Sequence, residues 1–273
     1  MQNQNNEFIE IEPNLRLHIR DWGEGKPVVF IPGWPLSHEM FEYQFMHLPK
    51  QGYRCIGITL RGFGKSSKPW GEYNYDVFAD DIKKVLEALE LRDVTLAGHS
   101  MGGAIALHYM ARHKSERISK LALFGAAAPS FTKRPGFPYG LEPSAVDGFI
   151  ESCYADRAKL NEDFGKIFFL DKKTASPKLR EWLQNMGMEA SPHATAACLA
   201  ALKNSDLRDD LARVNVPTMI FHSTQDKICL FELAEAMSAG IKGAKLVRFE
   251  KSGHGLFYEE QNKFNIELIN FVG

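Results

Sequence analysis

The sequence predicts an α/β fold, in which a mostly parallel sheet of eight strands carries helices on both faces. Between residues 27 and 128, short apolar segments alternate with longer segments of helical periodicity. The short segments are apolar throughout, which is typical of parallel strands covered on both faces. The same alternation resumes at residue 216 and continues to the end of the chain.

The elements follow in order from these patterns. Two segments that alternate apolar and polar residues, 8–11 and 15–19, predict a hairpin with one solvated face. Further strands are expected at 27–31, 53–59, 93–97, 118–124, 216–221 and 244–249. Helices are expected at 40–48 with Ser37 as N-cap, and at 75–91, 103–111, 230–239 and 258–272.

Residues 130–212 interrupt this alternation. They contain no strong strand and are rich in aromatic residues at helical spacing. We interpret them as a helical cap insertion laid over the edge of the sheet, so that residues 1–129 and 213–273 form the core. Most of the aromatic side chains are expected in the interior of the cap, and some of them in a pocket beneath it.

Charge and hydropathy exclude several classes of partner. The net charge of −1 over 273 residues favours neither nucleic acid nor an anionic membrane surface. No apolar run approaches the ~20 residues needed to span a bilayer, and the polar start lacks the profile of a signal peptide. We therefore expect a cytoplasmic protein that acts on a small molecule, with self-association left open.

Cysteine and histidine spacing predicts neither a disulfide framework nor a metal site. The four cysteines are scattered and form no C-x-x-C pair, so we expect reduced and mostly buried thiols. No His, Cys and Asp cluster has the spacing of metal ligands. The expectation is a protein without a cofactor.

A G-x-S-x-G run at Gly98–Gly102 is the most informative motif. A buried strand is expected before it, at 93–97, and a helix of small apolar residues after it, at 103–111. Strand, sharp turn and helix form the context in which this motif exposes a serine nucleophile, here Ser100. The flanking glycines remove Cβ atoms where the strand and the helix crowd together.

A serine hydroxyl needs a base to take its proton and an acid to orient that base. Two later loops, each following a predicted strand, offer Asp226 and His254. The order Ser100, Asp226, His254 is one of the known orders for this constellation. Glu250 is a weaker candidate for the acid. His99 lies beside the nucleophile, but its side chain is expected to point into the fold and pack there.

A pair of N–H donors is also expected, to stabilise the oxyanion of an acyl-transfer reaction. One is the amide of Met101, the residue after the nucleophile. The other is the amide of Trp34, in the loop that follows the strand at 27–31. Gly33 allows this backbone to approach the site, whereas Pro35 has no N–H to donate.

From about residue 7 to its end, the chain resembles the α/β-hydrolase superfamily. Within that superfamily it is similar to the cofactor-free haloperoxidase, aryl-esterase and perhydrolase group. The segments that carry the resemblance are Gly33-Trp34-Pro35-Leu36-Ser37, Arg61-Gly62-Phe63-Gly64-Lys65-Ser66, Phe78-Ala79-Asp80-Asp81 and Gly98-His99-Ser100-Met101-Gly102-Gly103.

The resemblance implies a triad of Ser100, Asp226 and His254, with an oxyanion hole formed by the amides of Trp34 and Met101. Members of the group hydrolyse small esters, and many make peracids from carboxylic acids and hydrogen peroxide. These peracids then oxidise halide in solution.

Three positions bear on how far the family pattern carries over. Pro35, after the oxyanion tryptophan, is the form that the resemblance associates with better perhydrolysis. Pro32 stands where the superfamily usually has a histidine that braces the oxyanion loop, so the bracing must differ. Thr59-Leu60 stands where an Asp usually precedes Arg61, which affects local packing more than chemistry.

We therefore expect a carboxylesterase-like serine hydrolase that acts on a small, fairly apolar ester through an acyl-enzyme, with perhydrolase activity as a variant. Lactone, amide or carbon–carbon bond hydrolysis by the same triad is an alternative, because pocket shape decides among these reactions. A ligand-sensing protein of slow turnover is another. Haloalkane dehalogenases and epoxide hydrolases need an Asp at the elbow, so Ser100 argues against them.

Overall fold

One sheet of eight strands runs through the computed structural model, which describes residues 7–273. The strand order is β1-β2-β4-β3-β5-β6-β7-β8; β1 and β2 are antiparallel, β2 is antiparallel to β4, and the other neighbours are parallel. The predicted fold class is thus confirmed. The bounds are β1 (Phe8–Glu12), β2 (Leu15–Trp22), β3 (Lys26–Ile31), β4 (Tyr53–Ile58), β5 (Val94–His99), β6 (Ile118–Phe124), β7 (Thr218–Ser223) and β8 (Lys245–Phe249).

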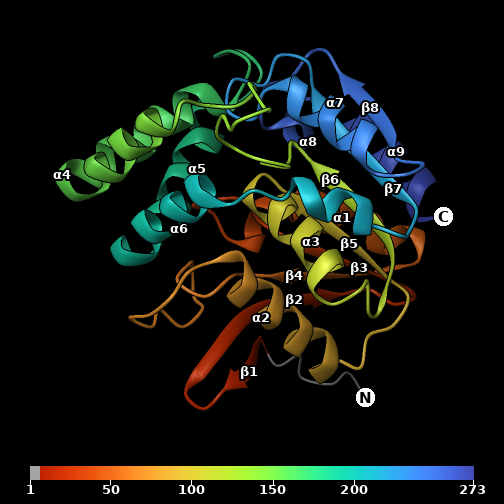
Figure 1. Ribbon diagram of the computed structural model, residues 1–273. Helices are drawn as coiled ribbons and strands as arrows, with labels where there is room; N and C mark the ends of the chain where they lie inside the picture. The colour runs from red at the N-terminus through yellow and green to blue at the C-terminus, as the bar shows by residue number, and fades with distance from the viewer. Residues whose placement is uncertain (1–6) are drawn as a thin grey trace.

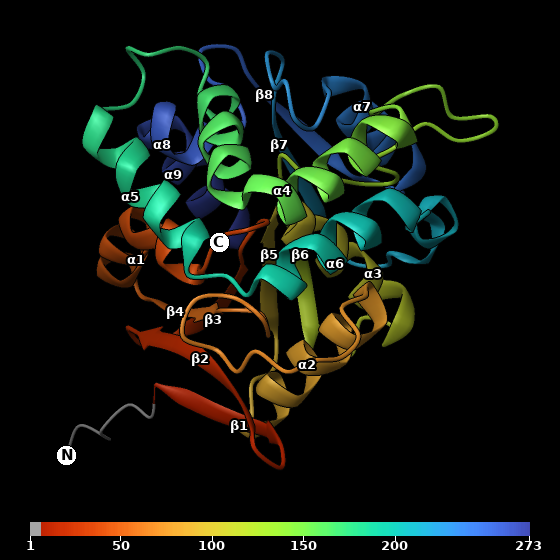
Figure 2. The ribbon, with the colours of Figure 1, turned by 90° about the vertical axis from the view of Figure 1, so that its left-hand side faces the viewer.

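Helices cover both faces of this sheet. Figure 2 shows α2, α3 and α7 on one side of the strands, and α1, α8 and α9 on the other. The bounds are α1 (Glu42–His47), α2 (Tyr75–Ala88), α3 (Met101–Arg112), α4 (Pro143–Phe168), α5 (Pro177–Met188), α6 (Pro192–Asn204), α7 (Phe231–Gly240), α8 (Leu256–Glu259) and α9 (Gln261–Val272). Short 3₁₀ turns are η1 (His38–Phe41), η2 (Leu48–Gln51) and η3 (Arg208–Arg213).

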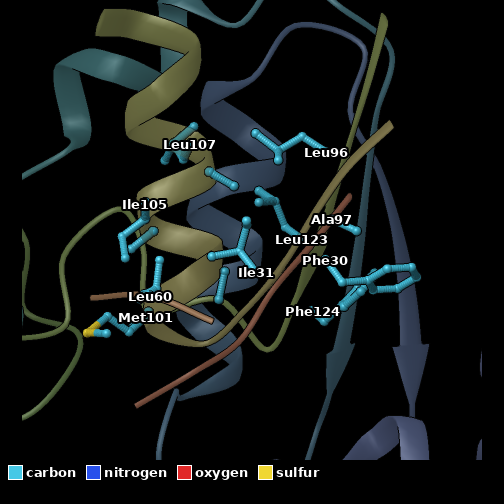
Figure 3. Close-up of a cluster of buried hydrophobic side chains, with 14 of the residues drawn as sticks. Phe30, Ile31, Leu60, Leu96, Ala97, Met101, Ile105, Leu107, Leu123 and Phe124 are labelled. Carbon is cyan, nitrogen blue, oxygen red and sulfur yellow. The ribbon is translucent and has the colours of Figure 1, made fainter. Parts of the chain in front are cut away.

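Helix α3 packs directly on the central strands. Figure 3 shows Ile105 and Leu107 of α3 in one cluster of buried side chains with Ile31, Leu96 and Leu123 from β3, β5 and β6. All five side chains are fully buried. This apolar contact fixes the start of α3 against the ends of the strands, which is where the predicted nucleophile lies.

Two predicted helices differ from the observed ones. The segment expected at 40–48 is divided into η1, α1 and η2, and the Ser37 side chain makes no capping hydrogen bond. The helix expected at 258–272 is broken at Glu260 into α8 and α9. The Glu260 carboxylate accepts hydrogen bonds from Lys251 N and Ser252 Oγ, each at 2.9 Å, and these bonds hold the chain at a turn.

Helices α4, α5 and α6 gather at one end of the sheet (Figures 1 and 2). Both α5 and α6 pack against α4. Ser176 and Ser191 cap the last two helices by accepting hydrogen bonds from Leu179 N and Ala194 N. These helices lie within the segment expected to form a cap. The division of the chain into core and cap remains a prediction.

Three further expectations concern the chain termini, membrane spans and cysteines. The N-terminal stretch that lacks a signal-peptide profile falls largely on residues 1–6, which lie outside the described part of the chain. Of the helices that the structure describes, none is long and apolar enough to cross a membrane. The cysteines Cys55, Cys153, Cys198 and Cys229 are buried and free, as expected.

A buried ion pair holds the loop that follows β4. Arg61 Nε donates to Asp81 Oδ2 at 2.6 Å, and the Asp81 side chain is almost fully buried. Thr59 stands in this loop where the superfamily usually has Asp. Its carbonyl accepts a hydrogen bond from Ser66 Oγ at 2.7 Å, and its Oγ1 accepts one from His38 N at 3.2 Å. The loop is therefore held without a carboxylate at position 59.

Removing the carboxylate of this buried pair should destabilise the fold. Asp81→Ala removes the buried carboxylate that pairs with Arg61 and leaves the guanidinium with the half-exposed Glu12, 3.3 Å away, so the free energy of unfolding should fall by up to about 3–5 kcal/mol. Urea denaturation of both proteins measures this difference. Glu181→Ala, which breaks an exposed pair with Lys178, is the control and should change stability by less than about 1 kcal/mol. Equal effects of the two substitutions would contradict the interpretation of Arg61 and Asp81 as a stabilising buried ion pair.

Candidate active site

The predicted nucleophile lies on a strained turn between β5 and α3. Ser100 has φ 53° and ψ −121°, a positive φ that is unfavourable for a residue with a side chain. Surrounding hydrogen bonds enforce it: Ser100 N donates to Phe124 O at 2.9 Å, and Ala127 N donates to Ser100 O at 3.0 Å. Such a turn holds the side chain clear of the helix that follows it.

Close backbone contacts on either side explain the two flanking glycines. A Cβ at Gly98 would lie 2.4 Å from the carbonyl oxygen of Gly102. A Cβ at Gly102 would lie 2.4 Å from the carbonyl oxygens of both Ile31 and Pro32. Any side chain at these positions would push the start of α3 away from β3 and β5.

Asp226 and His254 form a buried pair at the same end of the sheet. They follow the parallel strands β7 and β8, so their loops emerge at the edge where β5 also ends. His254 Nδ1 donates to Asp226 Oδ2 at 2.7 Å, and both side chains are fully buried. Asp226 Oδ1 accepts hydrogen bonds from Ile228 N at 2.8 Å and Cys229 N at 2.9 Å. The carboxylate is thus fixed on both oxygens.

The alternative acid, Glu250, lies elsewhere. It is exposed to solvent, and its backbone carbonyl accepts a hydrogen bond from the Gln225 side chain. Between the two candidates weighed from the sequence, Asp226 is therefore the one that contacts His254.

The hydroxyl of Ser100 is not hydrogen-bonded to the imidazole of His254 in this structure. Among the described residues, His254 Nε2 is buried and has no hydrogen-bond partner. Burial raises the pKa of the neighbouring Cys229 thiol well above its ordinary value, and Ser100 lowers that pKa to a smaller extent. Catalytic hydrogen bonds are often long or misaligned without substrate, so this arrangement is compatible with a resting site.

Two more histidines surround the pair, and their contacts were not predicted from the sequence. His99 points into the fold as expected, and its Nε2 donates to His254 O at 3.1 Å while the two rings lie 4.4 Å apart. His222 Nε2 donates to Cys229 O at 2.8 Å and lies 3.7 Å from Asp226 Oδ2. The His99 contact joins residues 155 positions apart, so no local pattern indicates it. The His222 contacts lie within the loop that follows β7 and depend on how that loop folds.

Burial and neighbouring charge set the electrostatics of the site. Burial alone would raise the pKa of Asp226, but the charge and hydrogen bond of His254 hold that pKa below its ordinary value. Burial lowers the pKa of both His99 and His222, so these rings stay neutral near pH 7. The two flanking imidazoles therefore add no charge beside the ionised Asp226 carboxylate.

The loop expected to supply an oxyanion donor lies against the nucleophile. A Cβ at Gly33 would lie 2.9 Å from Ser100 Cβ, so only glycine allows this approach. Trp34 follows, and the amide of Met101 has no partner within its helix because it belongs to the first residue of α3. Gly33 thus brings the loop that carries Trp34 close to Ser100, and the oxyanion role of the Trp34 and Met101 amides remains a prediction.

Trp34 also explains how residues 32–37 are braced without a histidine at Pro32. Its Nε1 donates to Thr195 O of α6 at 3.0 Å, and its ring meets that of Phe164 of α4 edge-on at 5.2 Å. The bracing thus comes from the helices above the sheet. The Trp34 side chain is buried, and it connects residues 32–37 to α4 and α6.

A cavity of about 290 Å³ opens at Ser100. Its wall is almost entirely apolar, with Asp163 and Lys227 as its charged residues. The lining residues are Trp34, Ser100, Phe131, Leu141, Phe149, Leu160, Asp163, Phe164, Ile167, Leu199, Leu202, Lys227 and Ile228. A small apolar molecule fits this surface, with Ser100 as the nucleophilic group beside it.

None of Ser100, Asp226 and His254 belongs to a group that could hold a metal ion. Within the part of the chain that the structure describes, such a group is formed by His18, His38 and Glu39.

Comparisons with known proteins agree with this geometry. A family model described as the alpha/beta hydrolase fold matches residues 26–261. The chain is 49% identical to the AB hydrolase superfamily protein YisY of Bacillus subtilis, over 97% of this chain and 98% of that protein. It is 32% identical to the non-heme chloroperoxidase CPO-A1 of Kitasatospora aureofaciens, over 94% and 96%.

A solved structure is also similar to this chain. The esterase EaEST of Exiguobacterium antarcticum is 44% identical and superimposes with a TM-score of 0.94, covering 97% of this chain and 98% of that one.

The lowered pKa of Asp226 predicts a pH-dependent contribution to stability. Because the pKa of Asp226 in the folded protein lies below its ordinary value, this contribution is present above the ordinary pKa and is lost as the pH falls through the folded pKa. The unfolding free energy of the wild type minus that of Asp226→Asn should therefore be smaller at about pH 3 than at about pH 7. Urea denaturation at both pH values measures the shift, and a constant difference would contradict it.

Proposed function

Because this chain belongs to the α/β-hydrolase family, we propose that it hydrolyses small, fairly apolar carboxylic esters through an acyl-enzyme formed on Ser100. One observation carries the proposal: the buried 2.7 Å hydrogen bond between His254 and Asp226, at the sheet edge where Ser100 sits on its strained turn. This arrangement supplies a base, its orienting acid and an exposed hydroxyl.

In the proposed reaction, Ser100 Oγ attacks the acyl carbon while His254 Nε2 takes the hydroxyl proton. Nε2 is free for this role because Nδ1–H donates to Asp226 and Nε2 has no other partner among the described residues. The Ser100 hydroxyl and His254 Nε2 must come within hydrogen-bond distance for this proton transfer. Asp226 then stabilises the imidazolium that forms.

The negative oxygen of the tetrahedral intermediate is proposed to lie between the amides of Trp34 and Met101. Met101 begins α3, so the positive end of the helix dipole reinforces its N–H. Losing one such donor costs roughly 100- to 1000-fold in turnover. The bonds that brace Trp34 against α4 and α6 therefore bear on rate as well as on stability.

Water then releases the acyl group as a carboxylic acid, or hydrogen peroxide releases it as a peracid. Similarity to a non-heme chloroperoxidase favours this second outcome, as does Pro35 after Trp34. The apolar cavity beside Ser100 favours an uncharged acyl or alcohol group. A cytoplasmic location and any self-association remain predictions from the sequence.

Two other functions remain as alternatives. The same three residues support lactone, amide or carbon–carbon bond hydrolysis. A ligand sensor would keep these residues and turn over slowly. Many turnovers of a chromogenic ester per site favour an enzyme, whereas one burst followed by a stable complex favours a sensor. A panel of acyl esters, assayed with and without hydrogen peroxide, separates hydrolysis from perhydrolysis.

Substituting the nucleophile should abolish ester hydrolysis. Ser100→Ala removes the attacking oxygen, so kcat for a p-nitrophenyl ester should fall by roughly 10⁴-fold or more. Steady-state kinetics measure this loss, and circular dichroism verifies the fold. Ser238→Ala, on the half-buried side of α7, is the matched control and should keep the wild-type rate. Undiminished activity in Ser100→Ala would refute the proposal.

A further inference from the structure

Two histidines and a glutamate from different parts of the chain gather behind the 32–37 loop. His18 comes from β2, whereas His38 and Glu39 are the first residues of η1. Each offers one ligand atom, and these three atoms all lie within 4.8 Å of one another. His18 is 3% exposed and His38 is 1% exposed, so their rings are removed from bulk water.

The His38 ring has one satisfied nitrogen and one free nitrogen. Nδ1 lies 2.7 Å from Thr59 Oγ1, and the hydroxyl oxygen has lone pairs enough to accept from both this ring and the His38 backbone N–H. With Nδ1–H donating, Nε2 carries a lone pair, yet it is buried and without a partner among the described residues. A histidine fixed through one nitrogen and open at the other is typical of metal ligands.

Neighbouring groups hold both rings in place. A Cβ at Gly57 would lie 2.8 Å from His38 Cβ and 2.9 Å from its Cγ, so the glycine lets the ring lie close to β4. The His18 and His38 rings are 4.8 Å apart, and the Phe8 ring packs 5.2 Å from His18 on its other side. The two imidazoles are therefore preorganised for a ligand between them.

The charges around the cluster would favour a cation that displaces the ammonium group of Lys65. Burial lowers the pKa of His18 and of His38, which favours the neutral form that binds metal. Glu39 supplies the negative charge, and Lys65 Nζ lies 4.0 Å from its carboxylate. The Lys65 side chain is 58% exposed, so it can move into solvent when a cation replaces it. Arg20 adds positive charge nearby and opposes cation binding.

From this arrangement we propose that His18, His38 and Glu39 bind a divalent transition-metal ion of the zinc class. Two imidazoles and one carboxylate form a known zinc ligand set, with bonds of about 2.0–2.2 Å. The ligand atoms must therefore approach one another on binding, and Glu39, with 26% of its side chain exposed, is free to move inward. The ion would connect β2 to η1 directly behind the predicted oxyanion donor, outside the proposed reaction itself.

Zinc titration of the full chain tests this proposal. After treatment with a chelator, the protein is titrated with ZnCl₂ by calorimetry, and Co²⁺ is added separately to record its absorption spectrum. We expect saturable binding of one ion per chain. Glu39→Gln and His18→Asn should each weaken it by about 10-fold or more, and Thr59→Val, which removes the partner of Nδ1, by about 10- to 100-fold.

Control variants separate this site from surface binding. His47→Asn and His193→Asn remove histidines outside the cluster and should leave zinc affinity unchanged. Circular dichroism and Tm in chelator verify that each variant is folded. A wild type that binds no zinc, or binding that survives Glu39→Gln and His18→Asn undiminished, would overturn the proposal. Binding lost in His193→Asn alone would place the ion elsewhere and overturn it too.

Discussion

The close contact between the start of α3 and the ends of β3 and β5 constrains everything at the candidate site. Gly98 and Gly102 allow backbone atoms to meet where any Cβ would clash. That crowding, together with the hydrogen bonds of Phe124 and Ala127, keeps Ser100 at a positive φ. The fully buried side chains of α3 and the central strands provide the free energy that maintains this strain.

The remaining parts of the site are held by contacts between distant loops. Asp226 is buried, yet it remains ionised because two backbone amides and the His254 ring satisfy its oxygens. His99 fixes the backbone of His254 through its carbonyl. Trp34 anchors the 32–37 loop to α6. The positions of the proposed base, acid and oxyanion donor thus depend on tertiary packing around a single sheet edge, and an error of about 1 Å there can cost roughly 100-fold in rate.

Sequence patterns predicted the sheet, its order of elements and the convergence of Asp226 with His254, because apolar runs and strand-end loops are local signals. They failed where side chains from distant segments decide the structure. The break at Glu260 depends on hydrogen bonds from Lys251 and Ser252. The contact of His222 with Cys229 depends on how the loop after β7 folds back. His18 and His38 lie on different elements, so their separation along the chain does not indicate a cluster.

We propose that His254, oriented by Asp226, makes Ser100 nucleophilic. Labelling with a fluorophosphonate, followed by peptide mass spectrometry, tests it most directly, because the probe reacts covalently with an activated serine. The account predicts one adduct, on the peptide that contains Ser100, and a labelling rate that falls by roughly 10³-fold or more in His254→Ala. An adduct on another residue, or equally fast labelling without His254, would contradict it.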